Sequence, residues 1–198
     1  MNILKIIFYE IFTLFMFFLE EAPGKSGKLL RQFIYGFLIK TDKNLNIENG
    51  VSIYGYSNIT LGKNVSLMRQ TKIYVRNANL VIGNNFACNN NCFLGCDFGD
   101  VTIGNNVLFG PNVVLRSSDH KHDFIDLPIN QQGHIKGKIN IGDGVWVASN
   151  AVITKNVTVG SNGIVAAGSV VTKDVEPNTI VAGVPAKKIA NRNQLSNL

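Results

Sequence analysis

The chain has 198 residues, of which 45% are hydrophobic, so its composition fits one folded domain with additional segments. Its formal net charge of +6 favours acidic partners such as phosphates, anionic glycans or lipid headgroups. The sequence shows no nucleic-acid-binding motif, which argues against DNA or RNA as a partner.

Residues 1–46 form a predicted N-terminal helical segment that is first apolar and then basic. Residues 3–19 are very apolar, interrupted by Lys5 and Glu10, and the stretch 11–19 between Glu10 and Glu20 is too short to cross a bilayer. Pro23 and acidic residues follow where a signal peptide would have a cleavage site. The stretch from residue 25 to residue 40 is amphipathic and basic.

Two interpretations of this segment remain open. In one, its helices cap the following domain and pack within an oligomer. In the other, they lie in a membrane interface with their aromatic side chains inserted and their basic side chains on the lipid headgroups. The basic residues are Lys25, Lys28, Arg31 and Lys40.

From residue 47 onward, aliphatic or aromatic residues recur every six positions. They are Ile47, Ile53, Leu61, Leu67, Ile73, Ile103, Phe109, Leu115, Ile141, Val147, Ile153, Val159, Val165 and Val171. A period of six fits neither a helix nor an alternating strand, and it is typical of a hexapeptide β-helix. Three short faces then make one turn of a triangular prism, with these side chains inside and with Gly, Asn and Asp at the corners.

We therefore predict an all-β solenoid, a parallel β-helix over residues 47–189. It follows the N-terminal helical segment and ends in a short C-terminal helix or tail over residues 190–198. The period fails between residues 120 and 138, which form a predicted extruded loop. This loop contains all three histidines of the chain, His120, His122 and His134. A loop that interrupts a rigid solenoid is a candidate functional element.

The chain has three cysteines, Cys88, Cys92 and Cys96. The six-residue register directs Cys88 and Cys92 inward and places Cys96 near a corner. Their number and spacing indicate free thiols in a reducing compartment rather than a metal cage.

Three stretches of the sequence resemble the hexapeptide-repeat acyltransferases. They are PNVVLRSSDH (111–120), IGDGVWVAS (141–149) and AAGSVVTKDVEPNTIVAGVPAKKI (166–189). The resemblance implies a left-handed parallel β-helix, acetyl-CoA as co-substrate with no metal required, and a homotrimer with active sites between adjacent prisms. It is nearest to the maltose and galactoside acetyltransferase type, in the branch that O-acetylates bacterial surface polysaccharides.

In this resemblance His120 matches the catalytic histidine, and an imidazole is suited to proton transfer near neutral pH. His122 is the rival base. Asp119, Asp123 or a backbone carbonyl would fix the imidazole tautomer. His134 matches no motif, and we expect it to be structural.

The resemblance also assigns two partners to His120. Trp146 matches a tryptophan near the thioester and the acceptor, and the register directs its side chain outward, where it needs a ligand or a subunit to cover it. Asn90 matches an asparagine that faces the catalytic histidine.

For the CoA arm, small residues allow close approach along the prism, and basic residues can meet the phosphates. Ser149, Ala166, Ala167 and Gly168 supply the small residues, Thr172 and Lys173 match positions near the adenine, and Lys187 and Lys188 are the candidate phosphate contacts.

The expected function is O-acetylation of a bacterial surface glycan or its precursor. The expected location is the cytoplasm or, as a peripheral protein, the inner face of the cytoplasmic membrane. The alternatives are N-acetylation of a nucleotide-linked amino sugar, acetylation of an antibiotic, a γ-type carbonic anhydrase, and a β-helix scaffold without activity.

Overall fold

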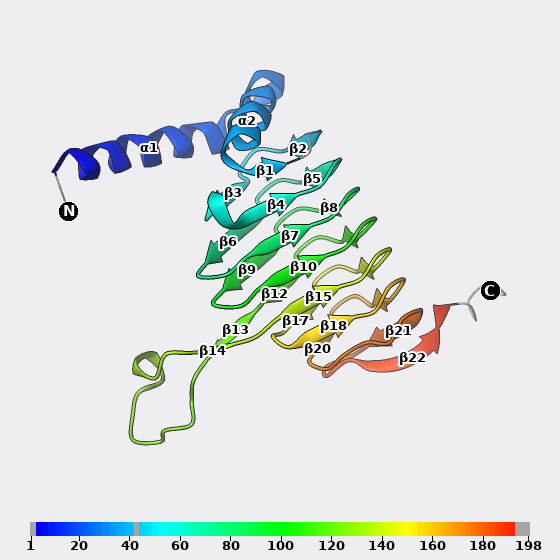
Figure 1. Cartoon of the computed structure of the whole chain (residues 1–198). Helices are drawn as coiled ribbons and strands as arrows, with labels where there is room; N and C mark the ends of the chain where they lie inside the picture. The colour runs from blue at the N-terminus through cyan, green and yellow to red at the C-terminus, as the bar shows by residue number, and fades with distance from the viewer. Residues whose placement is uncertain (1–2, 42–43, 193–198) are drawn as a thin grey trace.

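The protein is a triangular prism with two helices at one end. The structure is a computed structural model that describes residues 3–41 and 44–192. Helices α1 (Ile3–Glu21) and α2 (Gly24–Leu38) precede a left-handed parallel β-helix of about six turns (Figure 1). A long loop leaves the prism near its middle, and the last strands close the opposite end. The predicted fold class is confirmed.

Three parallel sheets form the faces of the prism. The first face consists of β1 (Lys40–Thr41), β4 (Ile59–Leu61), β7 (Leu80–Ile82), β10 (Val101–Ile103), β15 (Ile139–Ile141) and β18 (Val157–Val159). The second consists of β2 (Leu45–Ile47), β5 (Val65–Leu67), β8 (Ala87–Cys88), β11 (Leu108–Phe109), β16 (Trp146–Val147), β19 (Ile164–Val165), β21 (Thr179–Ala182) and β22 (Lys187–Asn191). The third consists of β3 (Ser52–Tyr54), β6 (Lys72–Arg76), β9 (Phe93–Asp97), β12 (Val114–Arg116), β17 (Val152–Ile153) and β20 (Val170–Val171). Strands β13 (Ser118–His120) and β14 (His134–Lys136) and the short helices η1 (Tyr56–Asn58) and η2 (Ile129–Gln131) lie outside these faces.

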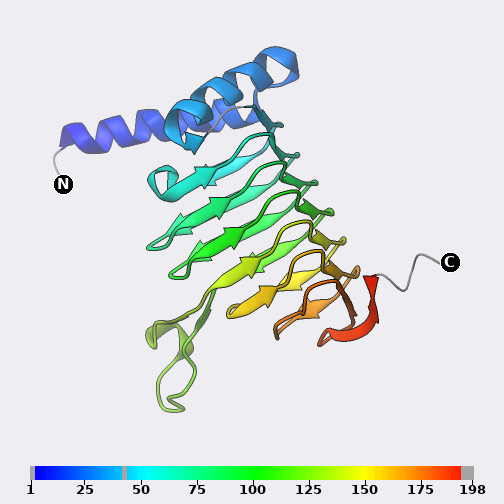
Figure 2. The same cartoon turned by 45° about the vertical axis from the view of Figure 1, so that its right-hand side comes forward.

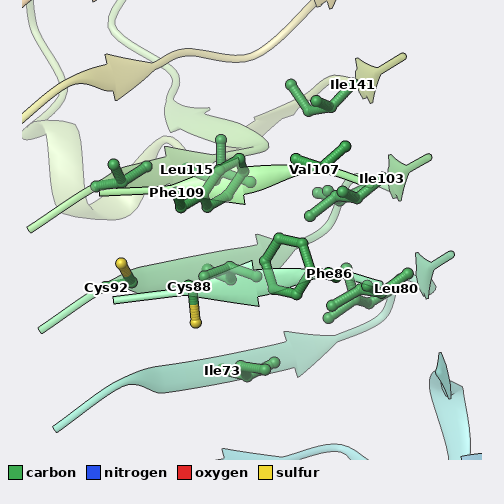
Figure 3. Close-up of a cluster of buried hydrophobic side chains, with 14 of the residues drawn as sticks. Ile73, Leu80, Phe86, Cys88, Cys92, Ile103, Val107, Phe109, Leu115 and Ile141 are labelled. Atoms are coloured by element: carbon green, nitrogen blue, oxygen red, sulfur yellow. The ribbon is translucent and has the colours of Figure 1, made fainter. Parts of the chain in front are cut away.

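The predicted inward positions form the core, and each of them is at most 3% exposed. Pairing is in register, so Phe109 lies over Val147 and Leu115 over Ile153. Phe86 and Phe109 meet edge to face inside the prism with 5.2 Å between ring centroids (Figure 3). A column of stacked side chains replaces the rounded core of a globular domain, as solenoid architecture requires.

Asparagine turns the chain from one face of the prism to the next at many corners, as predicted. Among the described residues, thirteen non-glycine residues have positive φ, and eleven of them are Asn. Asparagine tolerates this left-handed conformation better than most residues. The corner amides also bond along the prism, with Asn64 donating to Asn85 and Asn85 donating to Asn106, both at 2.9 Å. One ladder therefore both turns the chain and holds successive coils in register.

The two helices cap the first coil through Arg31. Its side chain is 1% exposed and donates to the carbonyl oxygens of Leu19, Glu20 and Ala22, at the end of α1, and of Ile47, in β2. Lys28 forms an ion pair with Glu48 at 2.9 Å. The membrane interpretation placed both side chains on lipid headgroups, and the structure corrects this. Unpaired carbonyls at the end of α1 bind the guanidinium of Arg31, and Glu48 pairs with Lys28.

The C-terminus differs from the predicted helix or tail. Residues Lys187–Asn191 form β22, which pairs antiparallel with β21. The last coil would otherwise expose a row of unpaired backbone groups, and β22 covers this edge. The strand runs across residue 190, where the tail was expected to begin, and residues 193–198 of that tail lie outside the described residues.

Cys96 also differs from its predicted place near a corner. It lies within β9 and is fully buried. Cys88 and Cys92 are also buried, with exposed fractions of at most 1%. At five residues, β9 is longer than most strands of the prism, so it carries one more inward position before the chain turns. All three cysteines are free, as predicted.

The outer side of the helical cap is apolar. Leu29, Phe33 and Phe37 form one stripe along α2 and are 56%, 72% and 85% exposed. Most of α1 is also exposed, and it crosses the end of the prism and projects beyond it (Figure 1 and Figure 2). Within the described ranges, neither helix combines the length and apolarity needed to span a membrane.

We predict that Arg31→Met loosens α1, because four backbone carbonyls lose their shared donor. Buried hydrogen bonds to a charged group contribute about 1.5–3 kcal/mol, so the free energy of unfolding should fall by about 2–3 kcal/mol. Hydrogen exchange of residues 3–21 should accelerate. The control is Lys28→Met, which removes a partly exposed ion pair worth at most about 1 kcal/mol. Unchanged exchange in Arg31→Met would contradict this account of the cap.

Candidate active site

The predicted loop is a β-ribbon that leaves the edge between the third and first faces, here called the ribbon edge. Strands β13 and β14 pair antiparallel, with Ser118 opposite Lys136 and His120 opposite His134. Gly99 lies at this edge, beside the segments that enter and leave the ribbon, and a Cβ atom there would lie 2.1 Å from the carbonyl oxygen of Gly137. The close crossing therefore requires glycine, and it fixes where the ribbon begins.

His120 is exposed at the outer end of β13, and its nearest described ring is that of His134. The two imidazole centroids are 4.5 Å apart, and His134 stacks on Phe98 at 4.6 Å. Sequence reasoning assigned His134 to a structural role without a partner. The pairing that brings the two rings together depends on the register of the ribbon, for which the sequence carries no repeated signal.

The other candidates around His120 have separate partners. Nδ1 of His122 lies 3.1 Å from the carbonyl oxygen of His120. The Asp119 carboxylate forms an ion pair with Lys155 of the next coil at 2.9 Å. Asp119 is therefore engaged away from the imidazole.

The small residues predicted to bind CoA lie on another edge, between the second and third faces, here called the ledge edge. Ser149, Ala166, Ala167 and Gly168 follow strands of the second face in two successive coils. The backbone N–H of Gly168 donates to Ser149 O at 2.9 Å, and that of Ala166 donates to Val181 O. A Cβ atom on Gly168 would meet nothing within 4 Å, so the space beside this backbone is open.

Gly110 extends the ledge by one coil, and sequence reasoning missed it. A Cβ atom at Gly110 would lie 2.7 Å from the backbone nitrogen of Ser149. The signal was present in the sequence, because Gly110 follows an inward Phe109 as Ala148 follows Val147. Asn90 lies on the same edge one coil further, exposed, with its carbonyl oxygen accepting the N–H of Asn112.

Trp146 points out of the second face, as predicted, and its exposed fraction is 47%. It stacks in register between Leu108 of β11 and Ile164 of β19. Leu108 is also half exposed. The three side chains form an apolar strip beside the ledge edge.

The remaining candidates for CoA binding lie in two places, the ribbon edge and strand β22. Thr172 and Lys173 are exposed on the ribbon edge, just after β20. Lys187 and Lys188 are adjacent in β22, so their side chains point to opposite sides of that strand. Lys188 also forms an ion pair with Glu176 at 3.3 Å. The two lysines therefore do not act on one phosphate together.

Within one chain the candidates form two groups that do not meet. His120, Thr172 and Lys173 are on the ribbon edge, whereas Asn90 and the small residues are on the ledge edge. The third face separates them, and residues 112–118 cross it, which at about 3.3 Å per residue places the edges roughly 15–20 Å apart. Within one chain, the exposed imidazole of His120 therefore lies on one side of the prism and the small residues lie on another.

The described residues contain no group of three or more His, Cys, Asp or Glu side chains with the geometry of a metal site. Cys88 and Cys92 lie inside the prism, where Cys92 donates to Gly110 O at 3.3 Å. Burial raises the pKa of the Cys96 thiol to about 12. The thiols therefore belong to the core.

Comparison with known proteins relates this geometry to a family. Residues 138–173 match the family model for bacterial transferase hexapeptide (six repeats). The chain is 37% identical over 181 residues to galactoside O-acetyltransferase of Escherichia coli K12, covering 89% of this chain and 85% of that protein.

Solved structures show the same architecture. A galactoside acetyltransferase in complex with coenzyme A superposes with a TM-score of 0.63 at 28% identity, covering 93% of this chain and 80% of that one. An N-acyltransferase from Bacillus cereus gives a TM-score of 0.71 at 18% identity, covering 84% and 93%. At that identity the second similarity concerns the fold alone.

Proposed function

The chain belongs to the hexapeptide-repeat transferases and is an acetyl-CoA-dependent acetyltransferase, and from this premise we propose that it acetylates a hydroxyl group of a bacterial surface glycan or its precursor. The observation that carries the proposal is the histidine-bearing ribbon opposite a ledge of small residues. The Escherichia coli relative is an O-acetyltransferase by name, which favours oxygen over nitrogen as the attacking atom.

His120 is the proposed general base. It accepts the proton of the acceptor hydroxyl while that oxygen attacks the thioester carbonyl, and it returns the proton to the sulfur when the C–S bond breaks. Its exposure at the ribbon end fits this role, because acceptor and thioester must both reach the imidazole. Trp146 and Asn90 are the proposed neighbours of the reacting groups.

The ledge edge fits the extended arm of CoA. Small residues follow one another along this edge from Gly110 to Gly168, and the open space at Gly168 lets a ligand lie against the backbone there. Lys187 is exposed, and Thr172 and Lys173 are exposed on the ribbon edge, from which they would reach CoA on the ledge edge of a neighbouring copy. The lysines can contact phosphate oxygens as point charges. The site residues present are therefore compatible with CoA.

The separation of the two edges supports a homotrimer with shared sites. A second chain placed beside the first can bring its ledge edge to the ribbon of its neighbour, and three such contacts close a ring. In both views α1 projects from the same side of the prism as the ribbon (Figure 1 and Figure 2). Both elements would then reach toward the same neighbour.

N-acetylation of an amino sugar is the competing proposal, and antibiotic acetylation is a second. A direct test measures thiol release from acetyl-CoA with a panel of acceptors that contains galactosides, maltose, amino sugars, aminoglycosides and bacterial capsule or lipopolysaccharide fragments. We expect turnover with glycans that offer hydroxyl groups. Turnover with amines only would favour N-acetylation, and absence of any turnover would favour the scaffold alternative.

We predict that His120→Ala lowers acetyl transfer by about 10²–10⁴-fold, the usual contribution of a general base. Binding of CoA, measured by calorimetry, should remain. The matched control is His122→Ala, two residues away on the same ribbon, which should keep most of the activity. An inactive His122→Ala beside an active His120→Ala would reverse the assignment.

We also propose that the outer side of the helical cap contacts the cytoplasmic membrane face as a peripheral anchor. The stripe Leu29, Phe33 and Phe37 is large, exposed and apolar, and such patches mark interaction sites. Because Lys28 is paired and Arg31 is buried, insertion of apolar side chains supplies most of the affinity, and the exposed Lys25 and Lys40 add electrostatic attraction.

We predict that the full chain sediments with vesicles containing phosphatidylglycerol and that the double variant Phe33→Ser/Phe37→Ser does not. High salt should weaken the wild-type interaction only partly, because charge contributes about 1 kcal/mol per exposed basic residue. The control is Val81→Ser, which removes an exposed apolar side chain from the first face. Wild-type protein that stays in the supernatant at low salt would contradict the membrane proposal.

A further inference from the structure

Four side chains form a stacked column at the base of the ribbon. The guanidinium carbon of Arg76 lies 4.9 Å from the centroid of the Phe98 ring. Phe98 stacks on His134, and His134 lies against His120, with centroid distances of 4.6 and 4.5 Å. The column thus runs from a strand of the prism to the end of β13.

Phe98 occupies a left-handed backbone position that asparagine fills at the same corner of two other coils. Its φ is +59°, and the residues at the same corner in other coils are Asn77 and Asn156, with φ of +51° and +59°. A large side chain in the left-handed region costs roughly 1–2 kcal/mol. Strain held at one corner of an otherwise regular ladder indicates a function for that side chain.

The lower end of the column is fixed to the prism. Nε and Nη2 of Arg76 donate to the two oxygens of Asp97 at 2.8 and 2.9 Å, and Asp97 is 7% exposed. The carboxylate raises the pKa of Arg76 by hydrogen bonding. A paired, planar guanidinium is a rigid support for an aromatic ring.

We infer that Phe98 and His134 are positioning residues that hold the imidazole of His120 in one orientation before the acceptor arrives. This inference rests on the proposed role of His120 as the base. Asp119 is paired with Lys155, and His122 lies against the His120 backbone, whereas the ring of His134 lies against the imidazole itself, so we assign the orientation to the stack. A misplacement of about 1 Å can cost on the order of 10² in rate.

The strongest test is Phe98→Asn, because asparagine relieves the strain of the left-handed backbone while the aromatic ring is removed. The melting temperature should stay the same or rise, whereas kcat should fall by about 10–100-fold. The KM for acetyl-CoA should change less than about twofold, since Phe98 is not one of the residues proposed to bind CoA. The separate variant Phe98→Tyr keeps the aromatic ring and should therefore retain the wild-type kcat.

Gln70→Asn is the matched control. Gln70 also has a positive φ, +61°, and lies outside the column, at the corner between β5 and β6, one coil beyond Asn90 and away from the small residues proposed to bind CoA. This variant should gain a similar stability and keep its kcat. If Phe98→Asn retains the wild-type kcat, the inference is wrong.

Substitutions of His134 separate positioning from proton transfer. His134→Phe keeps an aromatic ring against His120 and should stay within about threefold of wild-type kcat, whereas His134→Ala should lose about 10–100-fold. If His134→Phe is as inactive as His120→Ala, His134 itself transfers a proton, and the positioning role is overturned.

A spectroscopic readout keeps this test independent of the proposed function. The ring protons of His120 should show ring-current shifts in NMR spectra of the full chain, and these should move in His134→Ala and Phe98→Asn but not in Gln70→Asn. If the shifts move as expected but His120→Ala is still active, the assignment of His120 as the base is wrong and the stack stands. Unmoved shifts with an inactive His120→Ala would overturn the stack alone.

Discussion

Successive coils of this protein hydrogen-bond to each other in parallel register, and this constraint determines where every functional group can lie. Each strand donates to the strand of the next coil, so an inward residue in one coil fixes the inward residue below it. The corner asparagines hold the register by bonding to one another. Chemistry is therefore confined to outward positions, edges and interruptions, because the interior is filled with stacked aliphatic side chains.

Among the residues that the structure describes, the ribbon is the one long interruption of the prism, and the register explains both its rigidity and its place. The chain leaves at a corner, crosses itself where only glycine fits, and returns to the next coil without a shift in pairing, since Ile103 still lies over Ile141. Its stem is a pair of strands, and a strained phenylalanine supports it from below. A loop built in this way can present an imidazole at a defined height along the prism.

Much of the fold could be predicted from the sequence, because the six-residue period determines the interior directly. The outward direction of Trp146 followed from the inward direction of Val147 by simple alternation. The burial of Arg31 could not be predicted, because an arginine on a basic amphipathic helix is expected to face solvent. Its burial depends on backbone carbonyls of α1 and β2, which are brought to it only by the folded structure. His134 could not be paired with His120, because antiparallel register in a single hairpin has no repeat to reveal it. Strand β22 was missed because it follows the last coil and pairs in the opposite direction.

The central claim is that neither edge of one chain is sufficient and that a neighbouring copy completes each site. Mixing two inactive chains tests it. His120→Ala keeps an intact ledge, and Ala167→Trp, at an exposed position, blocks the ledge but keeps His120. After the two are unfolded and refolded together in equal amounts, random trimers of a cyclic assembly should hold about one functional site in four. The account predicts that acetyl transfer returns to about a quarter of the wild-type rate, and a mixture no more active than the two variants measured separately would contradict it.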